Sequence, residues 1–74
     1  MNRDRRKKLS KAFDKCAEIV DIIEQVRDEE NDSYENLPDN FRNGEKGDEM
    51  MGFIEMLDEA SGYIMDAQSV IEQI

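Results

Sequence analysis

Two aromatic and two cationic side chains lie within thirteen residues near the middle of the chain, and they are the strongest candidates for binding chemistry. Tyr34, Phe41, Arg42 and Lys46 are of the types that stack on a nucleobase and hold a phosphate group. A second interpretation is that the aromatic side chains close the end of a hydrophobic core while the cations pair with nearby acids. The sequence leaves both interpretations open.

Most of the other cations lie near the N-terminus. Residues 1–15 carry a net charge of +5, whereas residues 16–74 carry −14. An acidic body repels a long polyanion, which argues against general binding of duplex DNA. A small phosphorylated ligand needs only a local positive pocket. We expect Arg5, Arg6 and Lys8 to join the cations and aromatics from the middle of the chain around such a pocket when two copies pair antiparallel.

The composition argues against several other kinds of site. The chain has no histidine, which is the commonest metal ligand and general base. Acids alternate from Asp28 to Asp32, as they do in a calcium-binding loop. However, Ser33 stands where that loop needs glycine, and Asp39 stands where it needs glutamate. We therefore expect no bound metal, no cofactor and no catalytic activity.

Both halves of the chain carry two overlapping apolar seams with coiled-coil spacing, and these predict the elements that position the candidate residues. The seams of the first half are Leu9, Phe13, Cys16, Val20 and Ile23, and Ala12, Cys16, Ile19, Ile23 and Val26. Those of the second half are Met50, Phe53, Leu57, Ala60, Ile64, Ala67, Ile71 and Ile74, and Met56, Ala60, Tyr63, Ala67, Val70 and Ile74. One seam packs against one neighbouring helix, so a helix with two seams needs two neighbours.

The seams and turn residues predict a single helical-hairpin domain that spans residues 1–74. Helix 1 is expected over about residues 4–36, with Asn2 or Asp4 as its N-terminal cap and Pro38 ending it. Residues 38–46 have turn composition, and helix 2 is expected over about residues 47–74. Gly52 and Gly62 fall inside helix 2, where we expect them to mark close contacts.

A lone hairpin of this length buries too little apolar surface to offset the entropy of ordering its chain. Cys16 is the only cysteine, so no intrachain disulfide can form, and its place on a seam favours a buried, reduced thiol. The predicted fold class is therefore all-α: an antiparallel two-helix hairpin that assembles into a homo-oligomeric bundle, most simply four helices from two chains. The residues expected at the contact between copies are Phe13, Cys16, Val20, Ile23, Phe53, Leu57, Ala60, Ile64, Ala67 and Ile71. No stretch has the pattern of a signal peptide or membrane span, so we expect a soluble, cytoplasmic protein with no membrane partner.

Three short motifs resemble a group of small phage and prophage proteins from Gram-positive bacteria. They are the run Asp28-Glu29-Glu30, the turn Asn36-Leu37-Pro38 and the segment Gly44-Glu45-Lys46-Gly47 at the start of helix 2. The resemblance covers about residues 20–74, and the chain departs from it at Gly52 and Gly62. The group carries no established activity, so the resemblance implies a biological context and no chemistry.

That context favours a non-enzymatic counter-defence protein that acts in the cytoplasm of a bacterial host cell. One hypothesis is an oligomer that sequesters a small host-derived ligand such as a nucleotide immune signal. Another is an acidic inhibitor or nucleic-acid mimic that docks on a host defence protein. A structural or assembly role is the third.

Overall fold

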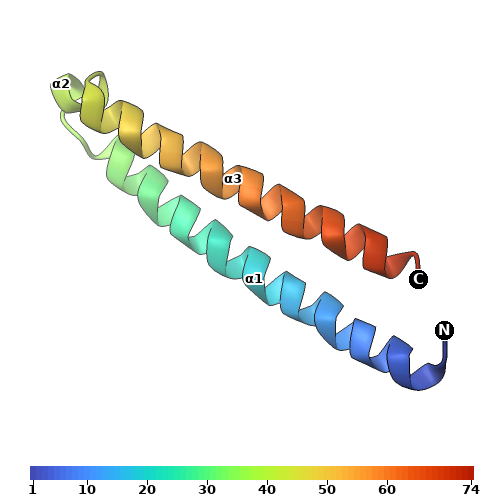
Figure 1. Ribbon diagram of the computed structural model, residues 1–74. Coiled ribbons are helices and arrows are strands. Elements are labelled where there is room, and N and C mark those ends of the chain that lie inside the picture. Colours follow the sequence, from blue (N-terminus) through green and yellow to red (C-terminus); the bar gives the residue numbers. More distant parts are fainter.

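The computed structural model describes all 74 residues as two long antiparallel helices joined by a short one (Figure 1). Helix α1 spans Arg3–Glu35, α2 spans Asp39–Arg42 and α3 spans Glu45–Glu72. The N- and C-termini lie together at one end of the rod, and α2 lies at the other (Figure 1). The predicted all-α class is confirmed, and α1 packs along α3. No helix combines the length and apolar character needed to cross a membrane.

Local chemistry accounts for the ends of the long helices. Oδ1 of Asn2 accepts a hydrogen bond from the Arg5 backbone N–H at 2.8 Å, so Asn2 caps α1. The same helix ends at Glu35, one residue before the expected limit and three residues before Pro38. Helix α3 begins two residues earlier than expected, after Gly44, and the turn contains α2, which the sequence pattern did not predict.

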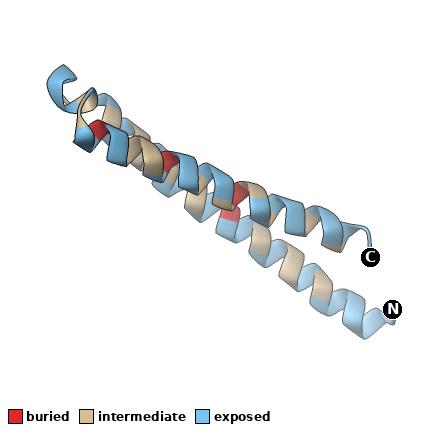
Figure 2. Ribbon diagram, turned by 45° about the horizontal axis from the view of Figure 1, so that its top comes forward, coloured by how far each residue is buried: buried red, intermediate tan, exposed pale blue.

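The contact between α1 and α3 buries very little. Only Val20, Gly47, Ile54 and Ser61 are buried in the whole chain (Figure 2). Around them lie half-buried residues of the first seam of each helix. A hairpin with such a thin interior has little apolar burial to set against the entropy of ordering 74 residues.

Helix α3 faces α1 along a line that differs in part from either predicted seam. Buried Ile54 and Ser61 lie seven residues apart, and Gln68 follows at the same spacing, where its Nε2 donates to the Phe13 carbonyl at 3.2 Å. We expected the small residues Ala60 and Ala67 to be the points of close approach between helices. Within the chain, the small buried residues are instead Gly47 and Ser61, and Ala67 is exposed.

The expectation that Gly52 and Gly62 mark close contacts is wrong within the chain. A Cβ atom built at either position would have no neighbour within 4 Å beyond its own local backbone. Both glycines therefore cost helix stability with no packing gain in the hairpin.

The residues expected at the contact between copies divide into two groups. Most belong to the contact within the hairpin, because they are buried or half-buried on the sides where α1 and α3 meet: Phe13, Cys16, Val20, Ile23, Leu57, Ile64 and Ile71. Ala60 is half-buried on the flank of α3, and Phe53 and Ala67 are exposed. The first seams thus serve mainly the hairpin. Most of the second seam of α3 stays uncovered, whereas on α1 only Ile19 and Val26 of the second seam are exposed.

Candidate binding surfaces

Arg42, the cation on which the predicted ligand site centred, is engaged in the turn itself. Its Nη2 donates to the carbonyl oxygens of Glu35 at 3.2 Å and Leu37 at 3.1 Å, and lies 3.4 Å from Oδ1 of Asp39. These carbonyls lie at the C-terminal end of α1, where backbone acceptors lack helical partners. Arg42 therefore ties the end of α1 to α2. A ligand role for this side chain stays a prediction.

Gly47 fixes the other side of the same turn. It is buried in the first turns of α3, and a Cβ atom there would collide with the backbone of Arg42, closest to its carbonyl oxygen. Glycine is thus the residue that allows α3 to start so close to the end of α2. The sequence pattern placed this glycine in the turn signature but gave no sign of the close approach.

The remaining turn residues do not converge on one cationic pocket. Phe41 is 51% exposed and Tyr34 is half-buried. Lys46 lines a shallow groove that also contains the carboxylates of Glu30 and Glu49. The two acids outweigh the single ammonium group, so this groove by itself does not favour an anionic ligand.

Arg5, Arg6 and Lys8 lie at the far end of the rod, because the molecule extends 58 Å along its long axis and the turn lies opposite the termini (Figure 1). A single chain therefore keeps them apart from Arg42 and Lys46. Bringing the two sets together would require a second copy.

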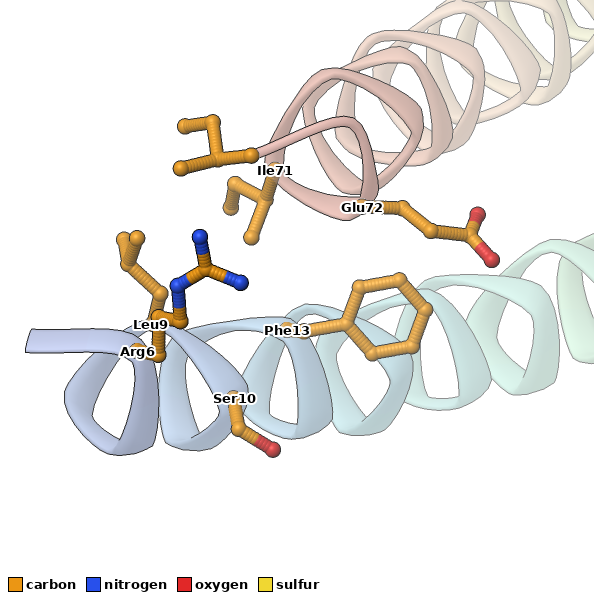
Figure 3. A pocket seen from close by; sticks show the side chains of 7 residues that line it. Arg6, Leu9, Ser10, Phe13, Ile71 and Glu72 are labelled. Atoms are coloured by element: carbon orange, nitrogen blue, oxygen red, sulfur yellow. The ribbon is translucent and has the colours of Figure 1, made fainter. Parts of the chain in front are cut away.

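An open, mostly apolar pocket lies where the two long helices end, and the sequence pattern did not predict it. It is lined by Arg6, Leu9, Ser10, Phe13, Ile71, Glu72 and Ile74. In Figure 3 the Arg6 guanidinium lies beside Leu9 on the side toward α3, and the Glu72 carboxylate extends above Phe13. No ion pair joins Arg6 to Glu72 within 4 Å.

One side of the hairpin carries a continuous uncovered apolar surface, which we call the apolar face. It consists of Ile19, Ile22 and Val26 of α1 and Phe53, Met56, Ala60, Tyr63, Ala67 and Val70 of α3. The exposed fractions of Tyr63 and Met56 reach 65% and 63%. A groove lined by Val26, Phe53, Met56 and Leu57, with Glu30 at its edge, shows that the two helices present these residues on the same side.

The opposite side carries carboxylates, and we call it the acidic face. By helical periodicity it consists of Asp14, Asp21, Glu24, Asp28 and Asp32 of α1 and Asp48, Glu55, Asp58 and Asp66 of α3. Glu59 lies between the two faces, because its Oε1 accepts a hydrogen bond from the Tyr63 hydroxyl of the apolar face at 2.9 Å. Arg27 is the only cation between residues 16 and 41. Its Nη1 donates to Asp58 at 2.8 Å and its Nη2 to Asp28 at 3.1 Å, which places these two carboxylates on one side of the hairpin.

The neighbouring carboxylates stabilise the charged form of Arg27. Hydrogen bonds to Asp58 first and Asp28 second raise the pKa of this guanidinium above its ordinary value. The other carboxylates of the face form no ion pair within 4 Å. Their charge is therefore available to a partner from outside the chain.

Neither surface has the geometry of a metal centre. No three Cys, Asp or Glu side chains converge as metal ligands. The acidic run from Asp28 to Glu35 lies on α1 and not in a loop, so its side chains spread around the helix. Comparisons with protein-family models, with curated proteins and with solved structures find no match for this chain.

Proposed function

We propose that this protein is a non-catalytic, self-associating helical hairpin that acts by docking its acidic face on a positively charged protein surface. The observation that carries the proposal is the separation of the two faces. An apolar face suits contact with another copy, while the acidic face on the other side stays available to a different partner. This arrangement is favoured over a ligand pocket in the turn because Arg42 is held by backbone carbonyls.

The acidic face can attract such a partner over a distance. Carboxylates follow both long helices, and apart from Asp28 and Asp58 they have no cation within 4 Å. A surface of one sign steers an oppositely charged partner and speeds association, and the effect weakens as salt screens it. The chain has an overall net charge of −9, so this attraction is not cancelled elsewhere on the molecule.

The resemblance to small phage proteins supplies the biological setting of the proposal. In that setting the protein acts in the cytoplasm of a bacterial host cell as a counter-defence factor. Its acidic face occupies the basic, nucleic-acid-binding surface of a host defence protein. Occupancy alone suffices for such an inhibitor, so no catalytic group is required.

The proposal is tested by neutralising acids without changing the shape of the face. The variant carries Glu55→Gln, Asp66→Asn and Asp21→Asn, which leave the Arg27 ion pairs intact. The matched control carries Glu18→Gln, Glu45→Gln and Glu72→Gln, which remove three exposed charges outside the acidic face. Both are used to capture proteins from a bacterial lysate, and each captured protein is then purified and titrated by calorimetry.

We expect a basic nucleic-acid-binding protein whose affinity falls at least tenfold in the variant and little in the control, with strong salt dependence. The captured protein should also release its nucleic acid when the hairpin is added. Equal affinity for variant and control, or a partner that keeps its nucleic acid, would contradict the proposal.

Sequestration of a small phosphorylated ligand is the second candidate function. It is favoured by the exposed aromatic ring of Phe41 and the exposed Lys46, which lie on the two helices that meet at the turn. Calorimetry against cyclic and linear nucleotides tests it, with Phe41→Ala and Lys46→Ala as the informative variants. Arg42→Ala is unsuitable because it removes the turn contacts as well.

A further inference from the structure

The apolar face follows a coiled-coil pattern that the chain itself leaves without a partner. Along α3, the positions of Phe53, Met56, Ala60, Tyr63, Ala67 and Val70 alternate in steps of three and four residues. This is the a/d spacing of a helix that packs against a neighbour. The α1–α3 contact uses a different line on α3, because Ile54 and Ser61 are buried there while Tyr63 is 65% exposed.

The side of the hairpin that carries the apolar face is large enough for a stable complex between two copies. The hairpin measures 58 × 15 Å across its two longest dimensions. Together with the charged residues beyond the apolar face, this side extends over about 870 Å², and a standard protein interface buries about 800 Å² on each partner. With four buried residues in the chain, a covered apolar face would add more interior than the hairpin has alone.

The charge distribution selects the occupant and its direction. The N-terminal segment of residues 1–15 carries +5, and residues 28–49 around the turn carry nine acids and two cations, a net charge of −7. These segments lie at opposite ends of the rod (Figure 1). Two copies related by a twofold axis can stack their apolar faces in two directions. In the parallel direction the two basic ends lie together. In the antiparallel direction the basic end of each copy lies beside the turn of its partner.

We propose that a second copy of this chain covers the apolar face in the antiparallel direction, with α1 stacked on α1 and α3 on α3 around an axis near Ile22 and Ala60–Tyr63. This proposal rests on the self-association proposed above and adds its face, direction and centre. The antiparallel direction sets the +5 segment of each copy against the −7 segment of the other. The parallel direction would bring like charges together at both ends.

One pair of opposite charges on this side of α1 fits the antiparallel direction. Lys8, Lys15, Ile22 and Glu29 recur every seven residues. Around an axis near Ile22, Lys15 of one copy approaches Glu29 of the other, because each lies seven residues from the centre. In a symmetric parallel pair, Lys15 of one copy would lie at the same height as Lys15 of the other, and the two Glu29 residues would also lie at one height.

The stacking direction is tested by measuring the distance between spin labels in the purified full chain. A label is attached at Lys7→Cys in a Cys16→Ala background, and electron paramagnetic resonance measures the separation between copies. Lys7 lies fifteen residues from Ile22, so at 1.5 Å per residue the antiparallel pair separates the labels by more than about 45 Å. A parallel pair keeps them at one height, at less than about 35 Å.

A matched control label at Gln25→Cys lies three residues from the proposed axis. It gives less than about 35 Å in either direction, so it reports pairing alone. A short Lys7 distance with a short Gln25 distance would overturn the antiparallel direction while leaving self-association intact. If neither label shows coupling and the chain sediments at 8.6 kDa, the second copy itself is rejected and the apolar face belongs to another partner. Arg5→Cys provides the same comparison if Lys7→Cys disturbs folding.

Discussion

Glutamate substitutions at two methionines of α3 distinguish a hairpin that stays monomeric from one that associates with a second copy. Met56 lies on the apolar face and is 63% exposed in the chain, whereas Met65 lies toward the acidic side and is 42% exposed. Full burial of a methionine side chain stabilises a protein by about 1.5–3 kcal/mol. In a lone hairpin, Met56→Glu should therefore cost about 0.5–1 kcal/mol and Met65→Glu about 1–2 kcal/mol.

Assembly reverses this order. If a second copy covers Met56, its exposed part contributes about 1–2 kcal/mol more per copy, and a carboxylate placed there must also be desolvated. Two copies together lose at least about 4 kcal/mol, which weakens association about a thousandfold. Sedimentation equilibrium gives the association constant of each variant, and circular dichroism gives its thermal stability. A Met65→Glu protein that is less stable and less associated than Met56→Glu would refute the reasoning.

Three smaller predictions concern single residues of α3 and are checked by urea unfolding monitored by circular dichroism. Gly52→Ala and Gly62→Ala should each stabilise the protein by about 0.5–1 kcal/mol, because a Cβ atom at either position meets open space. A loss of stability would show that another chain approaches these positions. Gly47→Ala should destabilise it, since the new methyl group collides with the Arg42 backbone, and unchanged stability would mean that the turn is looser than described. Ser61→Ala should stabilise it by about 1 kcal/mol, because the buried Oγ of Ser61 has no hydrogen-bond partner, and a loss would reveal a hidden one.

The sequence predicted the helices well because their signals are local. Asn2 at the start of α1 and Pro38 just beyond its end act on neighbouring backbone groups, and they set the limits that the structure shows. The alternation of apolar residues predicted that each long helix has more than one side to cover. These features depend on spacing along one helix and require no knowledge of its neighbours.

The line along which the helices meet could not be predicted from apolar residues alone. Close approach selects small side chains, so the α1–α3 contact passes through Ser61, which a search for apolar residues omits. A repeat that includes Ile54, Ser61 and Gln68 at seven-residue spacing was the available signal. The role of Arg42 at the candidate site could not be predicted either. Its residue type suggests phosphate binding, but in the structure its guanidinium donates hydrogen bonds to backbone carbonyls.

The central claim, that a second copy covers the apolar face, is tested most directly by measuring mass and helix content together during dilution. Sedimentation equilibrium should give twice the 8.6 kDa chain mass at high concentration. Over about a hundredfold dilution, mass and helical circular dichroism should fall together, because the hairpin alone buries too little to stay folded. A fully helical species of 8.6 kDa that persists across the dilution would contradict the claim.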